Sequence, residues 1–564
     1  MDPEPAAAPV PGAREPWPAR PAAGARERLV AVVRVYRERG SDVPADRRYA
    51  LYVAVLVVVI VGVPAVRALV LLVAQPDVLT TLRSPGAPRV SGVVAGLLLA
   101  GFAMLGQVRG PALLPPFFVS VLAGNDLPRR RTLLAPFVVA AGWTTFAVTA
   151  TTALLALTLA AQPVGWFSYE GSPPAPAAAL DGSAATASAL LLILCAASVG
   201  VLAGVLWLAG QRVGPHRSWV LPLVAAVCAL APVVAPATGW VVPSGWFSHA
   251  WAAATVGAGA RDGVGHLGDI PTETLVATTL LVALACVAAG LVPRLLDALA
   301  GPRVLEQARR WSSLTVAAGT GDLVAASERL QVPPRGFARR WRAVHEGPSW
   351  VQTPLSGLVG ALRTPGRLVA GGAWTVASGV VLAAAVTLPG PLRWWCAAVV
   401  GLTAFLATGP TSDGLRHAAE SASGPALYGY RTGGLLARHA VLPAVLTMLL
   451  GALGVVLGGR ASGAAFAADV VLVLLVVLVR AHRSARGGLP PGMLVSVPTP
   501  LGDLSGAVVL LWNLDWALLS VLAGLLSVAV VGSGATGEGA VSPAALAASL
   551  ALLLVLWTRA RLRR

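Results

Sequence analysis

The sequence contains no lysine, so every one of its 42 basic residues is an arginine. A nucleotide-binding loop of the P-loop type uses a lysine to reach the β- and γ-phosphates, and this chain therefore cannot build that kind of ATPase site. The sequence also lacks the His-Glu-x-x-His, Cys-x-x-Cys and Gly-x-Ser-x-Gly motifs of metalloproteases, paired thiols and serine hydrolases. We expect no enzymatic activity and no cofactor.

Charged residues are scarce. Only 12% of the 564 residues are charged, 56% are hydrophobic, and the mean hydropathy is +0.74, which excludes a soluble protein. The net charge of +17 rests on arginine, which stays protonated at any biological pH. Nearly all of this charge must therefore lie outside the lipid, and we expect no nucleic-acid partner.

The four cysteines lie inside long apolar runs, where a thiol acts as a small hydrophobic side chain. The seven histidines are dispersed through expected loops and span ends. We therefore predict neither a disulfide framework nor a metal site.

Long apolar runs are abundant. A helix needs about 20 apolar residues to cross a membrane, and about twelve runs approach this length, which predicts an all-α, polytopic integral membrane protein. The runs are approximately Tyr49–Ala74, Val90–Val108, Leu133–Ala161, Ser183–Ala209, Trp219–Gly239, Thr274–Leu296, Leu368–Thr387, Trp394–Thr408, Ala440–Gly458, Gly463–Val479, Gly506–Gly532 and Pro543–Trp557.

The residues before the first run form an arginine-rich leader, 1–48, rather than the apolar core of a cleavable signal peptide, so we expect the N-terminus to be retained. Within this leader, Arg26–Gly40 places Leu29, Val32, Val33 and Tyr36 on one helical face, which is the pattern of a helix lying in the membrane surface. A basic leader that only sets the topology explains these residues equally well.

Arginines alternate between loops, and this alternation predicts the orientation because arginine-rich loops stay in the cytoplasm. Single arginines on the other side are Arg83, Arg89, Arg261, Arg393 and Arg460. We expect both termini in the cytoplasm. The arginines on the cytoplasmic side are Arg47, Arg48, Arg129, Arg130, Arg131, Arg212, Arg217, those between 309 and 367, Arg416, Arg431, Arg438, Arg480, Arg483, Arg486, Arg559, Arg561, Arg563 and Arg564.

One long polar insertion divides the predicted runs into two six-helix halves, 49–298 and 367–564, with a cytoplasmic linker at 299–366. In each half the second run ends in Gly-Pro, at Gly110-Pro111 and at Gly409-Pro410, and a non-spanning stretch with arginines follows. Proline stops a helix. The two halves therefore read as a weak parallel repeat, as is common in transporters.

The loop Gly110–Thr132 is more apolar than a plain connector. It contains Phe117 and Phe118 and ends in a turn at Asp126, followed by Arg129, Arg130 and Arg131. We predict a short amphipathic helix of little more than two turns, starting near Pro115-Pro116, against the membrane or a partner. The alternative is a topological anchor, which needs the arginines but not the apolar face.

Polar residues within the expected spans are costly and indicate function or pairing. They are Arg67, Asp469, Asn513 and Asp515. An ion pair that includes Arg67 is at least as plausible as a substrate contact, and the sequence does not decide whether Asp469 or Asp515 would be the partner.

The residues Gly110-Pro111, the stretch Leu122–Pro136 and Thr320-Gly321-Asp322-Leu323 resemble the permease subunits of type-2 ABC exporters, in particular a group of two-half membrane proteins from GC-rich, actinobacterial-type genomes. In that group a Trp-Leu-Leu run usually precedes the proline and paired arginines, whereas this chain has Val121-Leu122-Ala123-Gly124 there.

The resemblance implies a permease in a bacterial plasma membrane, powered by a separate ATP-binding subunit, with the loop after the second span of each half as a coupling helix. The alternatives are a secondary transporter of the major-facilitator type, whose loop motif Gly124, Asp126, Arg130 and Arg131 echo at the wrong spacing, and a non-transporting membrane-embedded assembly protein. The substrate, the direction of transport and the oligomeric state stay open.

Overall fold

The fold is α-helical, as the sequence predicts. A computed structural model describes residues 52, 55–56, 58–123, 128–160, 183–213, 220–234, 236–257, 270–319, 341–342, 348–423, 431–487, 489–495, 498–499, 502–503, 505–532 and 542–562. Within them, the exception to helix and loop is one antiparallel pair of two-residue strands, β1 (Pro498–Thr499) and β2 (Gly502–Asp503). The leader 1–48, both termini and Thr320–Leu323 lie outside these residues.

The helices form two groups joined by a linker. The first group comprises the π-helix η1 (Val58–Gly62), α3 (Val63–Val73), α4 (Pro76–Leu82), α5 (Ala87–Val108), α6 (Pro116–Ala123), α7 (Arg129–Ala160), α8 (Ser183–Arg212), α9 (Val220–Val234), the 3₁₀ helix η4 (Pro236–Trp240), α10 (Pro243–Gly257) and α11 (Thr272–Asp297). The linker contains α12 (Gly301–Gly319) and α14 (Ser349–Leu362).

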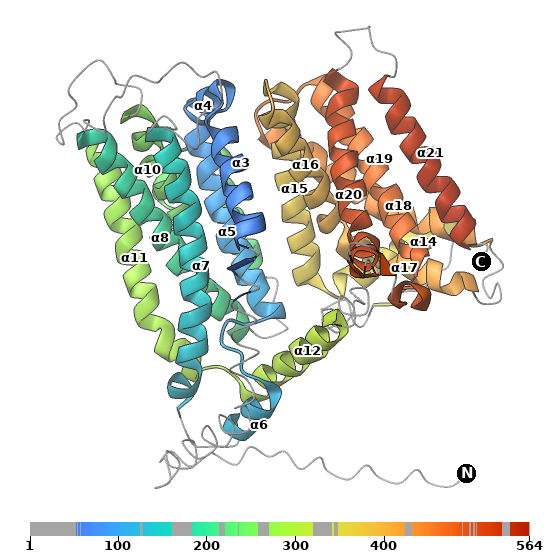
Figure 1. Cartoon of the computed structure of the whole chain (residues 1–564), viewed down its shortest axis with the longest axis horizontal. Helices are drawn as coiled ribbons and strands as arrows, with labels where there is room; N and C mark the ends of the chain where they lie inside the picture. The colour runs from blue at the N-terminus through green and yellow to red at the C-terminus, as the bar shows by residue number, and fades with distance from the viewer. Residues whose placement is uncertain are drawn as a thin grey trace.

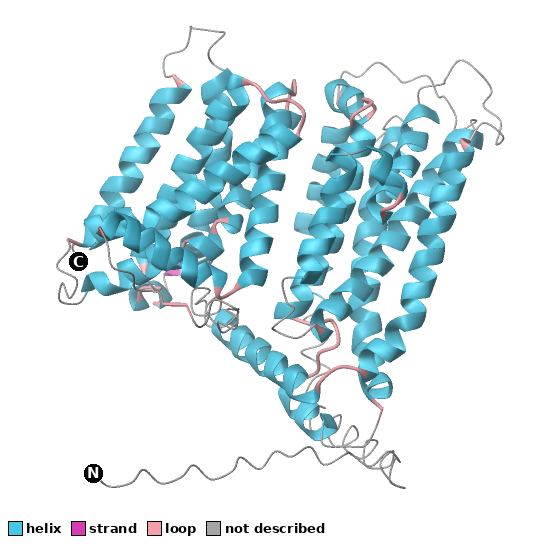
Figure 2. Ribbon diagram, turned by 180° about the vertical axis from the view of Figure 1, so that it is seen from behind, coloured by secondary structure: helices cyan, strands magenta, loops and turns pink. Residues whose placement is uncertain are grey.

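The second group comprises α15 (Pro365–Thr387), α16 (Leu392–Ala407), η7 (Gly409–Thr411), α17 (Asp413–Glu420), η8 (Ser421–Ser423), α18 (Thr432–Leu457), α19 (Gly463–Arg486), η9 (Pro491–Leu494), α20 (Ser505–Gly532) and α21 (Pro543–Leu562). In Figures 1 and 2 the two groups stand side by side. They make contact where α9 packs against α15.

Ten helical segments of the described part are long and apolar enough to cross a membrane: α5, α7, α8, α11, α15, α16 together with η7, α18, α19, α20 and α21. The chain thus has the helices of a multi-pass membrane protein. A bent pair, Val58–Val73 with Pro76–Leu82, raises the number to eleven if it is one span. The helix expected over Trp219–Gly239 ends at Val234, after 15 residues, so the number of twelve stays a prediction.

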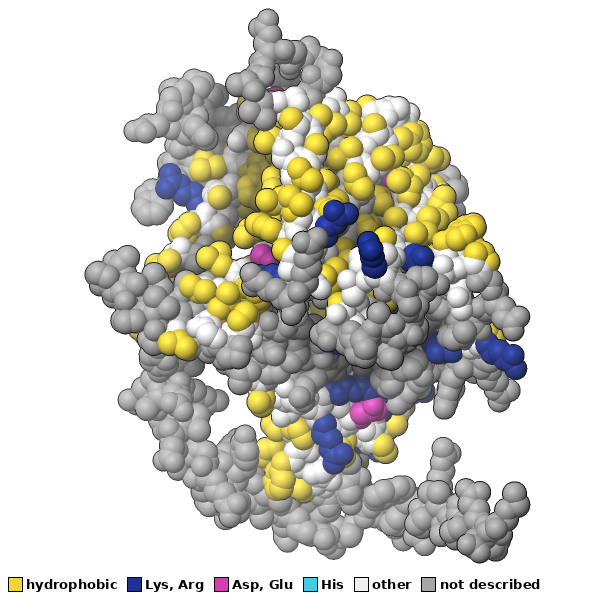
Figure 3. Space-filling model, turned by 90° about the vertical axis from the view of Figure 1, so that its right-hand side faces the viewer, with side chains coloured by type: hydrophobic (Ala, Val, Ile, Leu, Met, Phe, Trp, Pro, Cys, Tyr) yellow, Lys and Arg dark blue, Asp and Glu magenta, His cyan; other side chains and the backbone are white. Residues whose placement is uncertain are grey.

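One end of the bundle carries many arginines, and we call it the arginine-rich end. It is the end at which α5, α8 and α19 finish and α7 begins, with Arg109, Arg212, Arg486 and Arg129. The helices α6 and α12 lie at this lower end in Figure 1, where α12 runs obliquely from the first group toward the second. In Figure 3 hydrophobic side chains are concentrated in the upper part of the face in view, and most of the arginines lie across its middle and lower part.

The same helix pairings occur in both groups. In the first group α5 packs against α8 and α9, α7 against α8, and α8 against α11. At corresponding positions in the second group α16 packs against α19 and α20, α18 against α19, and α19 against α21.

Glycines let several of these helices approach closely, as small residues do in membrane bundles. A Cβ at Gly401 of α16 would lie 2.8 Å from the backbone nitrogen of Gly524 on α20, and a Cβ at Gly524 would lie 2.7 Å from that of Gly401. The two backbones therefore touch directly at this crossing.

Candidate functional site

The predicted loop helix after the second span is present as α6, eight residues long and beginning at Pro116. The Phe117 side chain is 64% exposed and meets Phe118 edge to face, with ring centroids 5.8 Å apart. Val119, by contrast, is buried in a core cluster with Val304 and Ala308 of α12. The apolar residues of α6 therefore serve two purposes: Val119 anchors the helix to the linker, while Phe117 projects from the protein.

The charged edge of this loop is described only from Pro128 onward, and Asp126 lies outside the described residues. Arg129, Arg130 and Arg131 form the first turn of α7. The backbone N–H of Arg130 donates to Asp297 Oδ1 at 2.9 Å, and its guanidinium lies 3.6 Å from Asp297 Oδ2. The carboxylate at the end of α11 thus satisfies an amide at the start of α7, as an N-terminal acidic group does.

Two buried amide side chains hold the start of the loop, and we call this cluster the amide latch. Gln211, at the end of α8, accepts from Ala112 N–H at 3.4 Å and donates to Ala112 O at 3.5 Å and to Gln307 Oε1 at 3.1 Å. Gln307 of α12 donates to Gly106 O at 3.1 Å and to Gln107 O at 3.2 Å. The latch therefore joins α5, the loop, α8 and the linker helix.

Aromatic residues brace the latch. Trp207 Nε1 donates to Arg109 O at 2.6 Å, and the Arg109 guanidinium lies 4.0 Å from the ring centroid of Trp311 on α12. Burial lowers the pKa of Arg109 from its ordinary value. Gly110 is required here because a Cβ would overlap the Gln211 side chain. No motif in the sequence marked Gln211, Gln307 or Trp311, since isolated glutamine and tryptophan residues in helices are unremarkable.

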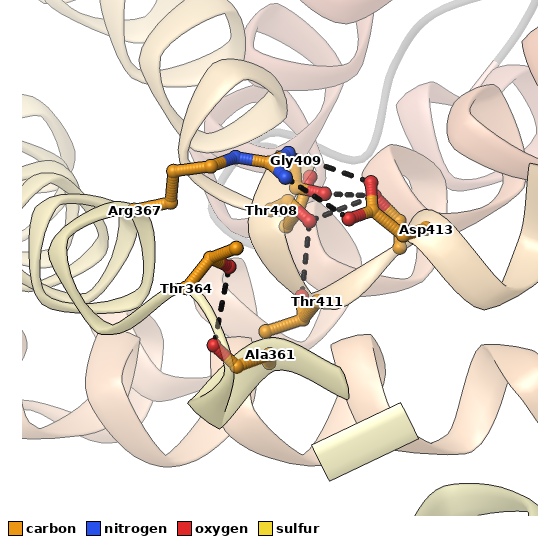
Figure 4. A network of polar contacts seen from close by, with 8 residues as sticks. Ala361, Thr364, Arg367, Thr408, Gly409, Thr411 and Asp413 are labelled. Carbon is orange, nitrogen blue, oxygen red and sulfur yellow. Dashed lines mark hydrogen bonds and ion pairs between the residues drawn. The ribbon is translucent and has the colours of Figure 1, made fainter. Parts of the chain in front are cut away.

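The second group repeats this arrangement with other residues. After α16, η7 leads into the eight-residue helix α17. Arg367, at the start of α15, donates to Asp413 Oδ2 at 3.1 Å and to Oδ1 at 3.4 Å. The hydroxyls of Thr411 and Ser412 donate to Thr408 O at 2.9 and 2.8 Å, which tightens the turn between α16 and α17 (Figure 4).

Arg480 of α19 occupies a role similar to that of Gln211. Its Nε donates to Phe405 O at 3.1 Å and to Thr408 Oγ1 at 3.0 Å. Both groups therefore share one feature. A polar side chain near the arginine-rich end of α8 or α19 holds the chain where α5 or α16 ends.

Three arginines one turn apart on α19 meet aromatic rings of α16 and α20. Arg480 lies 3.8 Å from the Phe405 centroid, and Arg483 lies 5.2 Å from that of Trp516. The Phe405 and Trp516 rings stack with centroids 5.0 Å apart. Arg486 lies 3.3 Å from the Trp512 centroid. Such cation–π contacts keep desolvated guanidinium groups stabilised.

Two of the four polar residues that are predicted to lie within spans, Asp515 and Asn513, have a partner in the structure. Asp515 forms an ion pair with Arg486, not with Arg67. Asn513 donates to Val509 O, one turn earlier in α20, at 2.9 Å. Arg67 is exposed on α3, and among the described residues no ion pair joins it to Asp469 or Asp515. Asp469 is buried against the backbone of Gly451.

A half-open, mainly apolar cavity of about 220 Å³ lies between α14, α15, α16, η7 and α18. Its lining includes Gly371, Thr375, Pro410, Thr411 and Thr447. In the part of the chain that the structure describes, no cluster of three or more His, Cys, Asp or Glu side chains could hold a metal ion.

Comparisons with protein-family models, with curated proteins and with solved structures found no match to this chain.

Proposed function

We propose that this chain is the membrane-spanning permease subunit of an ABC-type exporter in a bacterial plasma membrane, powered by a separate ATP-hydrolysing subunit. One observation carries the proposal: in each group an eight-residue helix, α6 or α17, comes after the helix of the second predicted span, α5 or α16. In both cases a polar side chain of a later helix, Gln211 of α8 or Arg480 of α19, holds the chain at or just after the end of that span. A coupling helix needs such an attachment, because the movement of a loosely attached loop would not be transmitted to the membrane-spanning helices.

The proposal includes twelve crossings, in two halves of six, with both termini in the cytoplasm. The fifth crossing would consist of α9, η4 and α10 together. A Cβ at Gly96 of α5 would overlap Ala229 of α9 and lie 3.2 Å from Ser244 Cβ of α10, and a Cβ at Gly92 would lie 3.3 Å from Ser248 Cβ. The two short helices thus follow one another along α5, which supports a single broken span. The first crossing would contain α3.

In this orientation the arginine-rich end faces the cytoplasm, and Phe117 points to where an ATPase subunit would dock. An exposed aromatic side chain on a short, firmly anchored helix fits the anchor of a helix-in-groove contact. The linker helix α12 packs on α6, and the latch joins α12 to α5, to α8 and to the loop before α6, so docking would reach α5, α8 and α12 together.

The test uses Phe117→Ala, with Phe146→Ala as its matched control. Phe146 is 63% exposed and forms a similar edge-to-face pair with Trp143, at 5.9 Å, but it lies within α7. Losing a hot-spot aromatic costs about 2 kcal/mol of binding, or about 30-fold in Kd. We expect Phe117→Ala to weaken binding of the co-purifying ATPase by about this factor, and Phe146→Ala to leave it unchanged.

The measurement is the affinity of the purified chain for its ATPase subunit, together with the ATPase activity of the complex. The chain alone should hydrolyse no ATP. Robust hydrolysis by the lone chain, or an ATPase that remains bound with unchanged affinity and activity after Phe117→Ala, contradicts the proposed coupling. A chain that purifies from its native membrane without any ATPase favours a secondary transporter or an assembly protein instead.

A further inference from the structure

Asp469 is the carboxyl group that the proposed function leaves unused. It lies six residues after the start of α19, or about 9 Å along the helix from the end opposite the arginine-rich end. The residue is only 3% exposed. It therefore sits inside the bundle, nearer to the end opposite the arginine-rich end.

The carboxyl group packs against the backbone of a glycine, and among the described residues it has no polar partner. It lies directly against the backbone of Gly451 on α18, where a Cβ would be 3.0 Å from Asp469 Cγ and would overlap Oδ1. Within the described part of the chain, Asp469 Oδ2 is buried without a hydrogen-bond partner, and no ion pair to Asp469 is formed. Its neighbours along α19, Ala465, Ala468 and Leu472, belong to apolar core clusters.

No charge of the surrounding helices compensates this carboxyl. The groups at the same end of the bundle are Arg393 and Cys396 of α16 and Arg460 in the loop between α18 and α19. Arg460 is exposed, and the Arg393 guanidinium lies 5.2 Å from the Trp394 ring centroid and donates to Val528 O at 3.3 Å. The charged or titratable side chains on α19 and on the helices packed against it are Arg367 (α15), Arg393 and Cys396 (α16), Asp413, Arg416, His417 and Glu420 (α17), Arg438 and His439 (α18), Arg480, His482, Arg483 and Arg486 (α19), Asp515 (α20), and Arg559 and Arg561 (α21).

Asp515, unlike Asp469, forms an ion pair with a guanidinium group, that of Arg486, in the same bundle. An ionised carboxylate without such a partner costs several kcal/mol in an apolar interior, whereas a neutral carboxylic acid costs much less. Intramembrane carboxyl groups of this kind are typical of proton pathways.

We propose that Asp469 is a proton-binding site: it is held as the neutral acid on Gly451 in the arrangement seen here, and it releases its proton to the aqueous phase at the near end when α19 shifts on α18. The ligand is a proton, and the site lies in a different part of the bundle from α6, so the proposal does not depend on an ATPase partner. Gly451 is also in close contact with α15, because its carbonyl oxygen faces Gly379.

The first measurement is infrared difference spectroscopy of the full chain in lipid nanodiscs, from about pH 6 to about pH 9, a range that covers documented buried carboxyl groups. We expect the carbonyl band of a protonated carboxyl group at the lower pH and its loss at the higher pH. The band should be absent from Asp469→Asn and retained in Asp515→Asn. Spectra that are identical for the wild type and Asp469→Asn overturn the proposal, and so does a band that persists unchanged to the highest pH.

The second measurement reports the shift of α19. Ala468 is fully buried in α19, and Ala461 is exposed in the loop before α19, so single cysteines at these positions, in a chain without the four native cysteines, form a buried probe and its water-accessible control. We expect the reaction of Ala468→Cys with a water-soluble thiol reagent, relative to Ala461→Cys, to rise about tenfold over the same pH range. Asp469→Asn mimics the neutral acid and should abolish the rise. A rise that survives Asp469→Asn rules out Asp469 as its cause.

Discussion

Replacing Gly110 by alanine tests the amide latch, because the new methyl group would occupy the position of the Gln211 amide. The backbone at Gly110 does not have positive φ, so alanine meets no conformational strain there. Gln211→Ala removes the same amide from the other side. In the double variant Gly110→Ala/Gln211→Ala the new methyl group overlaps nothing in the latch, because the Gln211 amide is absent.

The magnitude follows from the hydrogen bonds. The fully buried Gln211 side chain makes three of them, to Ala112 N, Ala112 O and Gln307 Oε1, and two are long, at 3.4 and 3.5 Å. A buried polar group left without a partner costs about 1–3 kcal/mol. Taking the lower end for the long bonds, each single variant should lose about 3 kcal/mol of local stability. The double variant should also lose about 3 kcal/mol rather than twice that, which is a large coupling energy.

Hydrogen exchange of the Ala112 amide measures this local stability, because that N–H donates to Gln211. A loss of about 3 kcal/mol in opening free energy corresponds to exchange about 150-fold faster. We expect this acceleration in each single variant and no further acceleration in the double variant. Additive effects, or a neutral Gly110→Ala, would show that the latch does not hold the loop.

Two further predictions concern helix packing and topology. Gly401→Ala should lower the thermal stability of the purified chain, because its Cβ would lie 2.8 Å from the Gly524 nitrogen, whereas Gly142→Ala on α7, where a Cβ meets nothing within 4 Å, should leave it unchanged or raise it; equal melting temperatures for the two variants would contradict the packing argument. In a background without native cysteines, Ser172→Cys should be protected from a cytoplasmic thiol reagent and Ser312→Cys should react with it, and the reverse at either position would overturn the predicted orientation.

The span prediction succeeds where hydropathy is uninterrupted. Ten of the twelve predicted runs coincide with helices that are long and apolar enough to cross a membrane. The fifth run, Trp219–Gly239, does not form one helix of spanning length, because hydropathy averages over breaks. Pro232, Pro236 and Pro243 interrupt the helical hydrogen bonding in this segment, so the chain forms α9, η4 and α10 instead of one straight helix.

The loop helix could be placed from sequence but its faces could not. Pro115 and Pro116 set its start, and α6 begins at Pro116. Phe117 and Val119 are both apolar, and only the position of α12 makes Val119 buried and leaves Phe117 exposed. The same limit applies to Gln211 and Gln307, which become a cluster only when α8 and α12 meet.

The helical class, most of the membrane helices and the clustering of arginine at one end follow from the order of apolar and charged residues alone, because lipid rejects charge and unpaired backbone groups residue by residue. Which polar groups inside the bundle have partners depends on how the helices pack. Asp515 and Asp469 look alike in sequence, but Arg486 approaches Asp515 from a neighbouring helix, whereas Asp469 meets the bare backbone of Gly451. That difference depends on how α18, α19 and α20 pack, and packing distances between helices are set by side chains far apart in the chain.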